Sequence, residues 1–140
     1  PTLSVAYRTR ARPAGSFRGR AQTLLTLVAK RTGRTFAEVS VAVVGESAMR
    51  TLNATYHGEH HATDVLSFGF SKRPVSGEIV ICLPVARRQA RSRAHPLTRE
   101  LEVLLVHGLL HLAGFDHERE KDLATMRAHE RAVLGVSLIP

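Results

Sequence analysis

The chain has 140 residues, 44% of them hydrophobic and 23% charged, which is the composition of an ordinary globular domain with one core. No apolar run reaches the roughly 18 residues that a membrane-spanning helix needs, and the first residues lack the apolar core of a secretory signal. We therefore expect a single domain over residues 1–140 and no membrane partner. The single cysteine, Cys82, excludes an internal disulfide and favours a buried thiol in a reducing, cytoplasmic compartment.

The net charge of +8 is concentrated at the start of the chain, because the first acidic residue is Glu38. Eight cations precede it: Arg8, Arg10, Arg12, Arg18, Arg20, Lys30, Arg31 and Arg34. Such a basic segment is typical of proteins that contact a polyanion such as nucleic acid. Two alternative causes of the charge stay open. Arginine outnumbers lysine 17 to 3, as codon bias would produce, and an acid-free, arginine-rich start is also typical of organellar transit peptides.

The first part of the chain predicts a strand, a helix and a second strand. The first strand is Leu3–Tyr7, and Ser16 is the expected cap of the helix that follows. Apolar residues then recur at three- and four-residue steps to about Thr32, where Gly33 can end the helix. The β-branched run Val39–Val44 predicts the second strand.

The middle of the chain predicts a helix and then a hairpin. The helix is expected over Ser47–Tyr56, followed by a polar loop over His57–Asp64. Val65–Phe70 alternates as a strand, residues 71–77 (SKRPVSG) form a turn region, and Glu78–Leu83 is another strand.

Three helices complete the predicted elements. A basic helix follows Pro84, and Thr98 is the expected cap of a strongly apolar helix over Arg99–Ala113, which Gly114 ends. The last helix is expected over Glu118–Leu134. Because strands and helices are interleaved, we expect an α+β domain with a small mixed sheet of about four strands packed with about five helices.

The stretch HGLLHLAGFDH places three histidines at spacings H-x3-H-x5-H. His107 and His111 project from one helix face, one turn apart, and Gly114 lets the chain turn back so that His117 reaches the same ion. Three neutral ligands leave a fourth position for water, as in catalytic zinc sites. Zinc is the preferred ion, and nickel, cobalt and manganese stay open. The alternative is a pair of core histidines with an exposed His117.

Gly108 distinguishes between two chemistries. The histidine layout is that of zinc peptidases, H-E-x-x-H-x-x-G-x-x-H, but Gly108 replaces their general base. Asp116 could act as a base or orient a histidine, or could be an ordinary turn residue. Phosphodiester cleavage needs a Lewis acid and positive charge around the phosphate, so a basic protein with an open metal site fits it better than amide hydrolysis.

With these residues in view, the chain resembles the YbeY family of metal-dependent endoribonucleases. The resemblance is carried by LNATYH, TDVLSF, GEIVIC, HGLLHLAGFDH and TMRAHERAVL, in order, from about Thr51 to Leu134. It implies a small α+β domain with one zinc ion at His107, His111 and His117. It also implies a single-strand-specific endoribonuclease that acts in maturation of the small-subunit ribosomal RNA 3′ end and in ribosome quality control. The implied partners are the ribosome, small-subunit proteins and an assembly GTPase, in the bacterial cytoplasm.

Four positions depart from the family pattern. His57 stands where the family has an arginine thought to meet the substrate phosphate. It could do so when protonated, or act as an acid or base, or be a solvated loop histidine. Ala62 replaces a proline, His60 an aspartate and Glu78 another aspartate. The added histidines, which include His61, could lie near the ion or belong to a variable surface loop.

Other residues have weaker support as substrate contacts. Arg87, Arg88 and Arg91 lie on one basic helix and could contact RNA or form a solvated face. Thr63 and Ser67 are expected to line the cleft by analogy alone.

The sequence therefore predicts a zinc-dependent endoribonuclease with His57 and Asp116 as catalytic candidates. The nucleophile stays open between water and the substrate 2′-hydroxyl. Two alternatives remain: a non-catalytic ribosome-assembly factor stabilised by a metal, and another zinc hydrolase such as a metallopeptidase, against which Gly108 counts.

Overall fold

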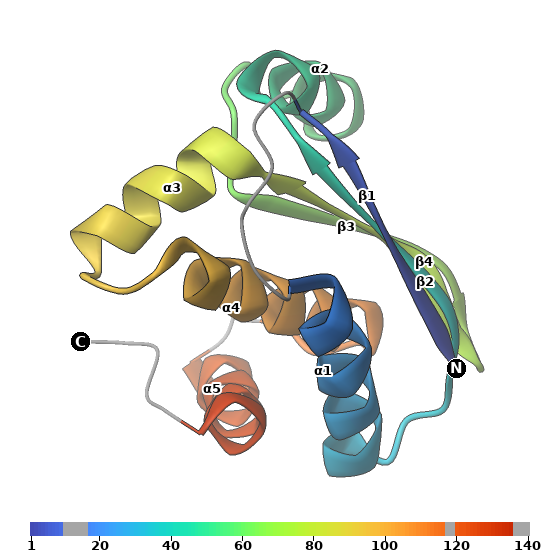
Figure 1. Ribbon diagram of the computed structural model, residues 1–140. Coiled ribbons are helices and arrows are strands. Elements are labelled where there is room, and N and C mark those ends of the chain that lie inside the picture. Colours follow the sequence, from blue (N-terminus) through green and yellow to red (C-terminus); the bar gives the residue numbers. More distant parts are fainter. Residues whose placement is uncertain (10–16, 117–119, 136–140) are drawn as a thin grey trace.

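A four-stranded mixed sheet organises the computed structural model, which describes residues 1–9, 17–116 and 120–135. The strand order is β1 (Thr2–Arg8), β2 (Phe36–Val44), β4 (Val75–Cys82) and β3 (Val65–Lys72). β1, β2 and β4 run parallel, and β3 pairs antiparallel with β4. Parallel neighbours need a crossover connection, and the helix between β1 and β2 provides one (Figure 1).

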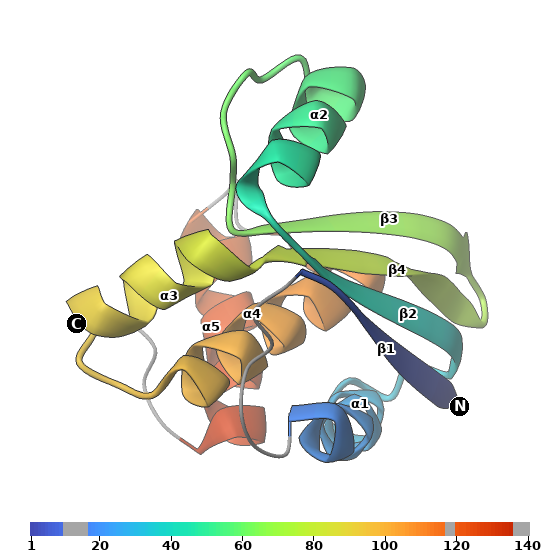
Figure 2. The ribbon, with the colours of Figure 1, turned by 45° about the horizontal axis from the view of Figure 1, so that its top comes forward.

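Three helices lie on one side of the sheet: α1 (Phe17–Thr32), α4 (Leu97–Leu112) and α5 (Glu120–Leu134). α4 packs on β3 and β4, α1 packs on β1 and α4, and α5 packs on α1 and α4. α3 (Leu83–Ser92) follows β4 directly and contacts α4, while α2 (Glu46–His57) lies across the other face (Figure 2). The described elements confirm the expected α+β fold.

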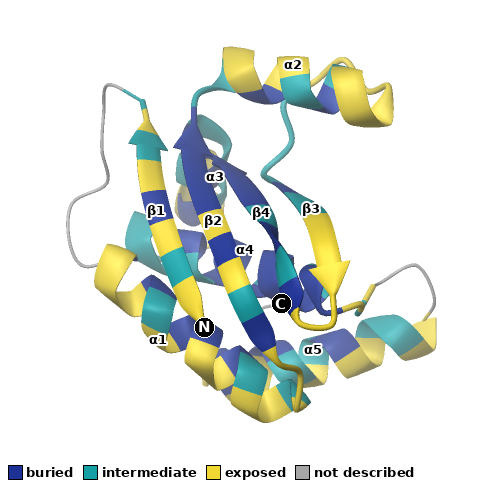
Figure 3. Ribbon diagram, turned by 90° about the vertical axis from the view of Figure 1, so that its right-hand side faces the viewer, coloured by how far each residue is buried: buried dark blue, intermediate teal, exposed yellow. Residues whose placement is uncertain are grey.

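The sheet separates two apolar clusters of unequal size. The main core includes fully buried leucines of α4, Leu101, Leu105 and Leu109, against strands and α1. The smaller cluster lies under α2 and includes Met49 and Cys82. Burial raises the pKa of the Cys82 thiol, as expected for a structural cysteine. The central strands are largely buried, whereas the edge strands β1 and β3 keep exposed residues (Figure 3).

The predicted elements are all present in the described part of the chain, with three corrections to their ends. The cap prediction at Thr98 is wrong, because α4 begins at Leu97 after an extended Pro96 and no side chain caps it. Proline has a fixed φ and suits a position just before the first helical turn. The predicted cap Ser16 lies outside the described residues.

The other two corrections concern the hairpin and the end of α2. The turn over residues 71–77 was predicted too long: Lys72 pairs with Val75, so only two residues connect β3 and β4. Val75 also pairs with Phe36 of β2, which extends β4 at its start. His57 is the last residue of α2 rather than a loop residue, because Gly58 adopts the left-handed conformation that ends a helix. In the described part of the chain, no helix is both long and apolar enough to span a bilayer.

Candidate metal centre and cleft

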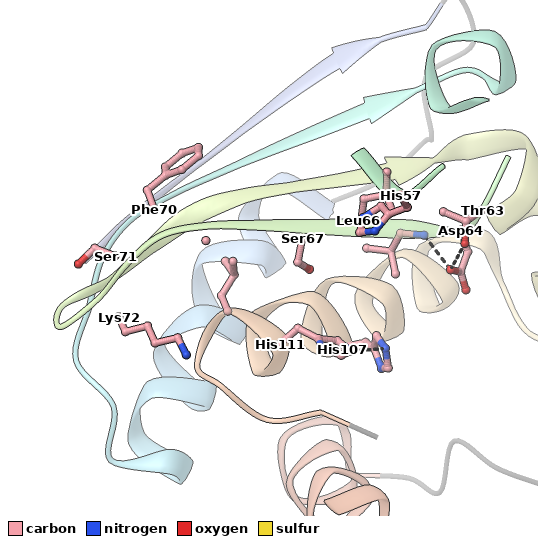
Figure 4. Close-up of a pocket in the computed structure, with 13 residues that line it drawn as sticks. His57, Thr63, Asp64, Leu66, Ser67, Phe70, Ser71, Lys72, His107 and His111 are labelled. Carbon is pink, nitrogen blue, oxygen red and sulfur yellow. Dashed lines mark hydrogen bonds between the residues drawn. The ribbon is translucent and has the colours of Figure 1, made fainter. Parts of the chain in front are cut away.

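A cleft of about 890 Å³ opens between the edge strand β3 and helix α4 (Figure 4). α4 contributes His107, His111 and Leu112, and α2 contributes its last residue, His57. The other described lining residues are Thr63, Asp64, Val65, Leu66, Ser67, Gly69, Phe70, Ser71 and Lys72. Sequence segments far apart are thus brought to one hollow, and the expectation that Thr63 and Ser67 line it agrees with the structure.

The two α4 histidines converge on one point in the cleft wall. The Nε2 atoms of His107 and His111 lie 3.1 Å apart, and the ring centroids are 4.7 Å apart. Two imidazole ligands at zinc–nitrogen distances of about 2.0–2.1 Å in a tetrahedral site would lie roughly 3.3 Å apart. The separation of the two Nε2 atoms is close to this value, so the spacing of the pair fits two ligands of the predicted metal.

Glu130 of α5 contacts the His107 ring at Nδ1, the nitrogen that does not face His111. Its Oε1 lies 3.2 Å from Nδ1 of His107, and Glu130 is only 6% exposed. With the Nδ1–H donating to this carboxylate, the Nε2 of His107 keeps its lone pair for a metal. This partner was missed from the sequence. A signal existed, since Glu130 falls four residues after buried Met126 on the apolar face of α5.

The predicted third ligand, His117, lies outside the described residues. Within residues 1–9, 17–116 and 120–135, no group of three His, Cys, Asp or Glu side chains could hold an ion. Gly114, with φ of +100°, turns the chain after α4 as predicted. The next residue, Phe115, packs edge-on against His129 at 4.8 Å and under Arg34 at 5.3 Å.

Asp116 is exposed and is not among the described residues that line the cleft. Its predicted catalytic role therefore stays a prediction.

Gly108 faces the sheet rather than the cleft. A Cβ on this residue would lie 2.9 Å from Cγ2 of fully buried Ile79, and Ser67 donates a hydrogen bond to the Gly108 carbonyl at 3.4 Å. Glycine thus lets α4 approach β3 and β4 closely. A glutamate at this position would force α4 and β4 apart and would point at the sheet, so the base of a zinc peptidase does not fit this packing.

His57 borders the cleft from the end of α2. Its exposed ring is stacked with Phe68 at a centroid distance of 6.5 Å, and Tyr56 meets the same phenyl ring edge-on at 5.1 Å. The structure therefore brings His57 to the same cleft as the α4 histidines, as its candidate role requires.

The loop histidines, by contrast, are exposed and do not line the cleft. Buried Asn53 anchors their loop, since its side-chain amide donates to the His61 carbonyl at 2.9 Å. These observations favour the surface-loop alternative for His60 and His61.

The three α3 arginines lie away from the lining of the cleft, and their role as RNA contacts stays a prediction. Arg88 pairs with Glu46 of α2 at 2.7 Å. The hydrogen bond from Arg88 and then its charge lower the pKa of Glu46 below its ordinary value. Arg87 is half-buried and Arg91 is exposed.

Phe70 and Lys72 are among the cleft residues that were not singled out from the sequence. Both fall where the sequence pattern predicted a strand end and a turn. The sequence offered little indication of a role for them, because an aromatic residue or a lysine near a turn is usually an ordinary surface residue.

Comparison with known proteins gives the same family that the motifs suggested. A family model described as Endoribonuclease YbeY matches residues 7–136. A protein named Endoribonuclease YbeY from Paraburkholderia phymatum is 42% identical over 102 residues, which cover 71% of this chain and 67% of that protein. A second, from Moorella thermoacetica, is 41% identical over 116 residues, 73% of this chain and 74% of the relative. A third, from an Anaeromyxobacter species, is 45% identical over 70% of this chain, but the match spans only 53% of its own length.

The fold agrees with a solved structure as well. The solution structure of a protein from Thermotoga maritima superposes with a TM-score of 0.61 at 26% identity, covering 96% of this chain and 90% of that one. The family match spans nearly the whole chain, and it includes the paired histidines, the LNxxY helix and the β3–β4 hairpin. The chain therefore belongs to the YbeY endoribonuclease family.

Proposed function

We propose that this protein is a metal-dependent endoribonuclease that cuts single-stranded RNA in the cleft between β3 and α4. The observation that carries the proposal is the convergence of two imidazole nitrogens, 3.1 Å apart, on the wall of that cleft. The names of the relatives support RNA as the substrate. The net charge of +8 suits a polyanion.

His107, His111 and His117 would hold one ion, for which three imidazoles favour zinc over other divalent transition metals. Such an ion supplies Lewis-acid stabilisation of the charge that develops on a reacting phosphate. Glu130 keeps the His107 ring in the tautomer and orientation that ligation needs.

The remaining cleft residues serve the substrate. His57 can donate to a phosphate oxygen or exchange a proton from the end of α2, and Lys72 brings a positive charge to the other end. Asp116, beside the third histidine in sequence, is the proposed orienting or proton-accepting carboxylate. The packing of Gly108 against Ile79 argues against peptide hydrolysis as the reaction.

In the cell, the proposed role is maturation of the small-subunit ribosomal RNA 3′ end and ribosome quality control in the cytoplasm. The ribosome, small-subunit proteins and an assembly GTPase are the proposed partners. The family membership supports this role.

The test is cleavage of a short single-stranded RNA that covers a small-subunit rRNA 3′ end. We expect the native protein to cut it, and the His111→Ala variant or chelator to abolish cutting. Cyclic phosphate on the products would assign the nucleophile to the 2′-hydroxyl rather than water. A protein with one bound metal that leaves this RNA and intact pre-ribosomes uncut would refute the nuclease.

One observation favours a second candidate, a non-catalytic assembly factor. His57 carries only a conditional charge where the family pattern has a permanent one. On this alternative, the His111→Ala variant would still bind pre-ribosomes and support maturation, whereas the nuclease proposal expects maturation to fail.

A further inference from the structure

The β3–β4 hairpin carries an exposed aromatic ring at one end of the cleft. Phe70 is 71% exposed, more than any other large hydrophobic residue that the structure describes. It borders the cleft and also a second hollow, of about 250 Å³, on the sheet. Single-stranded nucleic-acid binders stack bases on aromatic rings that are exposed in this way.

The surroundings of Phe70 combine hydroxyl groups with apolar side chains. The second hollow is lined by Ser4, Ser40 and Ser76 together with Leu3, Val39 and the carboxylate of Glu38, and the cleft side is lined in part by Ser71 and Lys72. Hydroxyls suit the edges of a nucleobase, and an ammonium group suits a backbone phosphate.

Among the described residues that line the cleft, only Lys72 carries a permanent positive charge. The other basic residues there are histidines, which are charged only when protonated. In Figure 4, Lys72 points to the side of the hairpin that faces the helices, and the Phe70 ring rises from the other side. An RNA strand that passes along the edge of β3 could therefore place a phosphate at Lys72 and turn the attached base outward over Phe70.

The hairpin lies next to the histidine pair. Ser67 bonds to Gly108, and a Cβ on Gly69 would lie 3.9 Å from Leu112, so β3 and α4 run side by side over this stretch. Phe70 and Lys72 follow Gly69 by one and three residues, roughly 3 to 10 Å along a strand. A nucleotide held there is close in the strand to the one at the metal centre.

We propose that Phe70 and Lys72 form a binding subsite for one unpaired nucleotide beside the scissile bond. The ring of Phe70 stacks on its base, and the ammonium group of Lys72 contacts its phosphate. The subsite favours single strands, because a base inside a duplex stacks on its neighbours and does not reach a side chain without being turned out. This inference rests on the proposed function.

The test compares RNA binding and cleavage by variants of Phe70 and Lys72 with those of variants of exposed residues away from the cleft. For the full chain as purified, the RNA concentration for half-maximal cleavage should rise about tenfold in Phe70→Ala, as for removal of one stacking aromatic. The same shift should appear in the Kd from fluorescence anisotropy once chelator stops cleavage. Lys72→Gln should lower the slope of log Kd against log salt by about 0.7, the value for one phosphate contact to a single strand.

Controls come from outside the cleft lining: Leu27 of α1 is 38% exposed, and Lys121 of α5 is exposed. Leu27→Ala removes an exposed apolar side chain and Lys121→Gln an exposed ammonium group, and both variants should keep the native Kd and salt slope. Phe70→Tyr should keep the native affinity, and thermal unfolding midpoints should show that all variants fold.

An abasic scan makes the test specific. In the native protein, one abasic nucleotide in the RNA should weaken binding about as much as Phe70→Ala, and in Phe70→Ala that position should cost nothing further. Native Kd and salt slope in both hairpin variants would overturn the subsite while cleavage by the native protein upheld the nuclease. A change of oligomeric state in Phe70→Ala with native RNA affinity would assign the ring to a protein contact and also overturn it. A native protein that neither binds nor cuts RNA would overturn the proposed function, and the subsite with it.

Discussion

Replacing Gly108 by alanine tests the packing that sets α4 against the sheet. The added Cβ would lie 2.9 Å from Cγ2 of Ile79, 3.1 Å from its Cδ1 and 3.2 Å from its Cγ1. Both γ carbons are bonded to the Ile79 Cβ, and the residue is fully buried. Rotation of the Ile79 side chain therefore does not clear the overlap, and the helix or the strand must move.

The expected magnitude is a difference of two effects. Overpacking a core costs about 1–3 kcal/mol, and alanine in place of glycine in a helix returns about 1 kcal/mol. We expect Gly108→Ala to lose about 1 kcal/mol of unfolding free energy, measured by urea denaturation with an unchanged m value. Gly19→Ala on α1 is the matched control, because no atom of the described residues lies within 4 Å of its added Cβ. This control should be neutral or slightly stabilising.

A double-mutant cycle isolates the overlap. Ile79→Ala removes all three atoms that the new Cβ would meet, at a cost of about 2–5 kcal/mol by itself. In that background, Gly108→Ala should become neutral or stabilising, a coupling of about 1–2 kcal/mol. If Gly108→Ala stabilises the native background as Gly19→Ala does, α4 does not approach β4 as closely as described, and the argument against a peptidase glutamate fails with it.

Three further predictions concern the supports of the site. Glu130→Gln should raise the metal Kd about 10- to 100-fold, as for other carboxylate partners of ligating histidines, and competition with a chromophoric chelator measures it; an unchanged Kd would contradict the orienting role. Gly77→Ala should lower the free energy of unfolding in urea by at least about 2 kcal/mol. The added Cβ would lie 2.5 Å from the Phe68 carbonyl oxygen, and a backbone oxygen cannot rotate away. Unchanged stability of this variant would contradict the register between β3 and β4. Arg88→Gln should lower stability at neutral pH and lose its effect at acid pH. The partner Glu46 has its pKa lowered below 4.5 in the folded state, so its contribution is present above 4.5 and disappears as pH falls through the folded value. If the ion pair did not form, paired urea titrations across that range would show an effect of Arg88→Gln that does not change with pH.

Periodicity and local chemistry carried much of the prediction. The alternating runs and the Leu-rich helix gave the elements and the α+β class, and the four-residue spacing put His107 and His111 on one face of α4. The errors concerned the ends of helices and strands, where several neighbouring residues could each begin or end the element. Pro96, not Thr98, precedes the first turn of α4, and Gly58, not Tyr56, sets the end of α2.

By itself, the sequence determined the family, through its ordered motifs, and the paired histidines of the metal motif. Only the tertiary structure decided that Glu130 stands behind His107, that Arg88 pairs with Glu46 of another helix, and that Phe70 and Lys72 border the cleft. The physical reason is the separation in sequence between the residues that meet. Helix and strand periodicity relate residues a few positions apart, whereas these contacts join segments whose meeting depends on how α4, α5 and the β3 edge pack together.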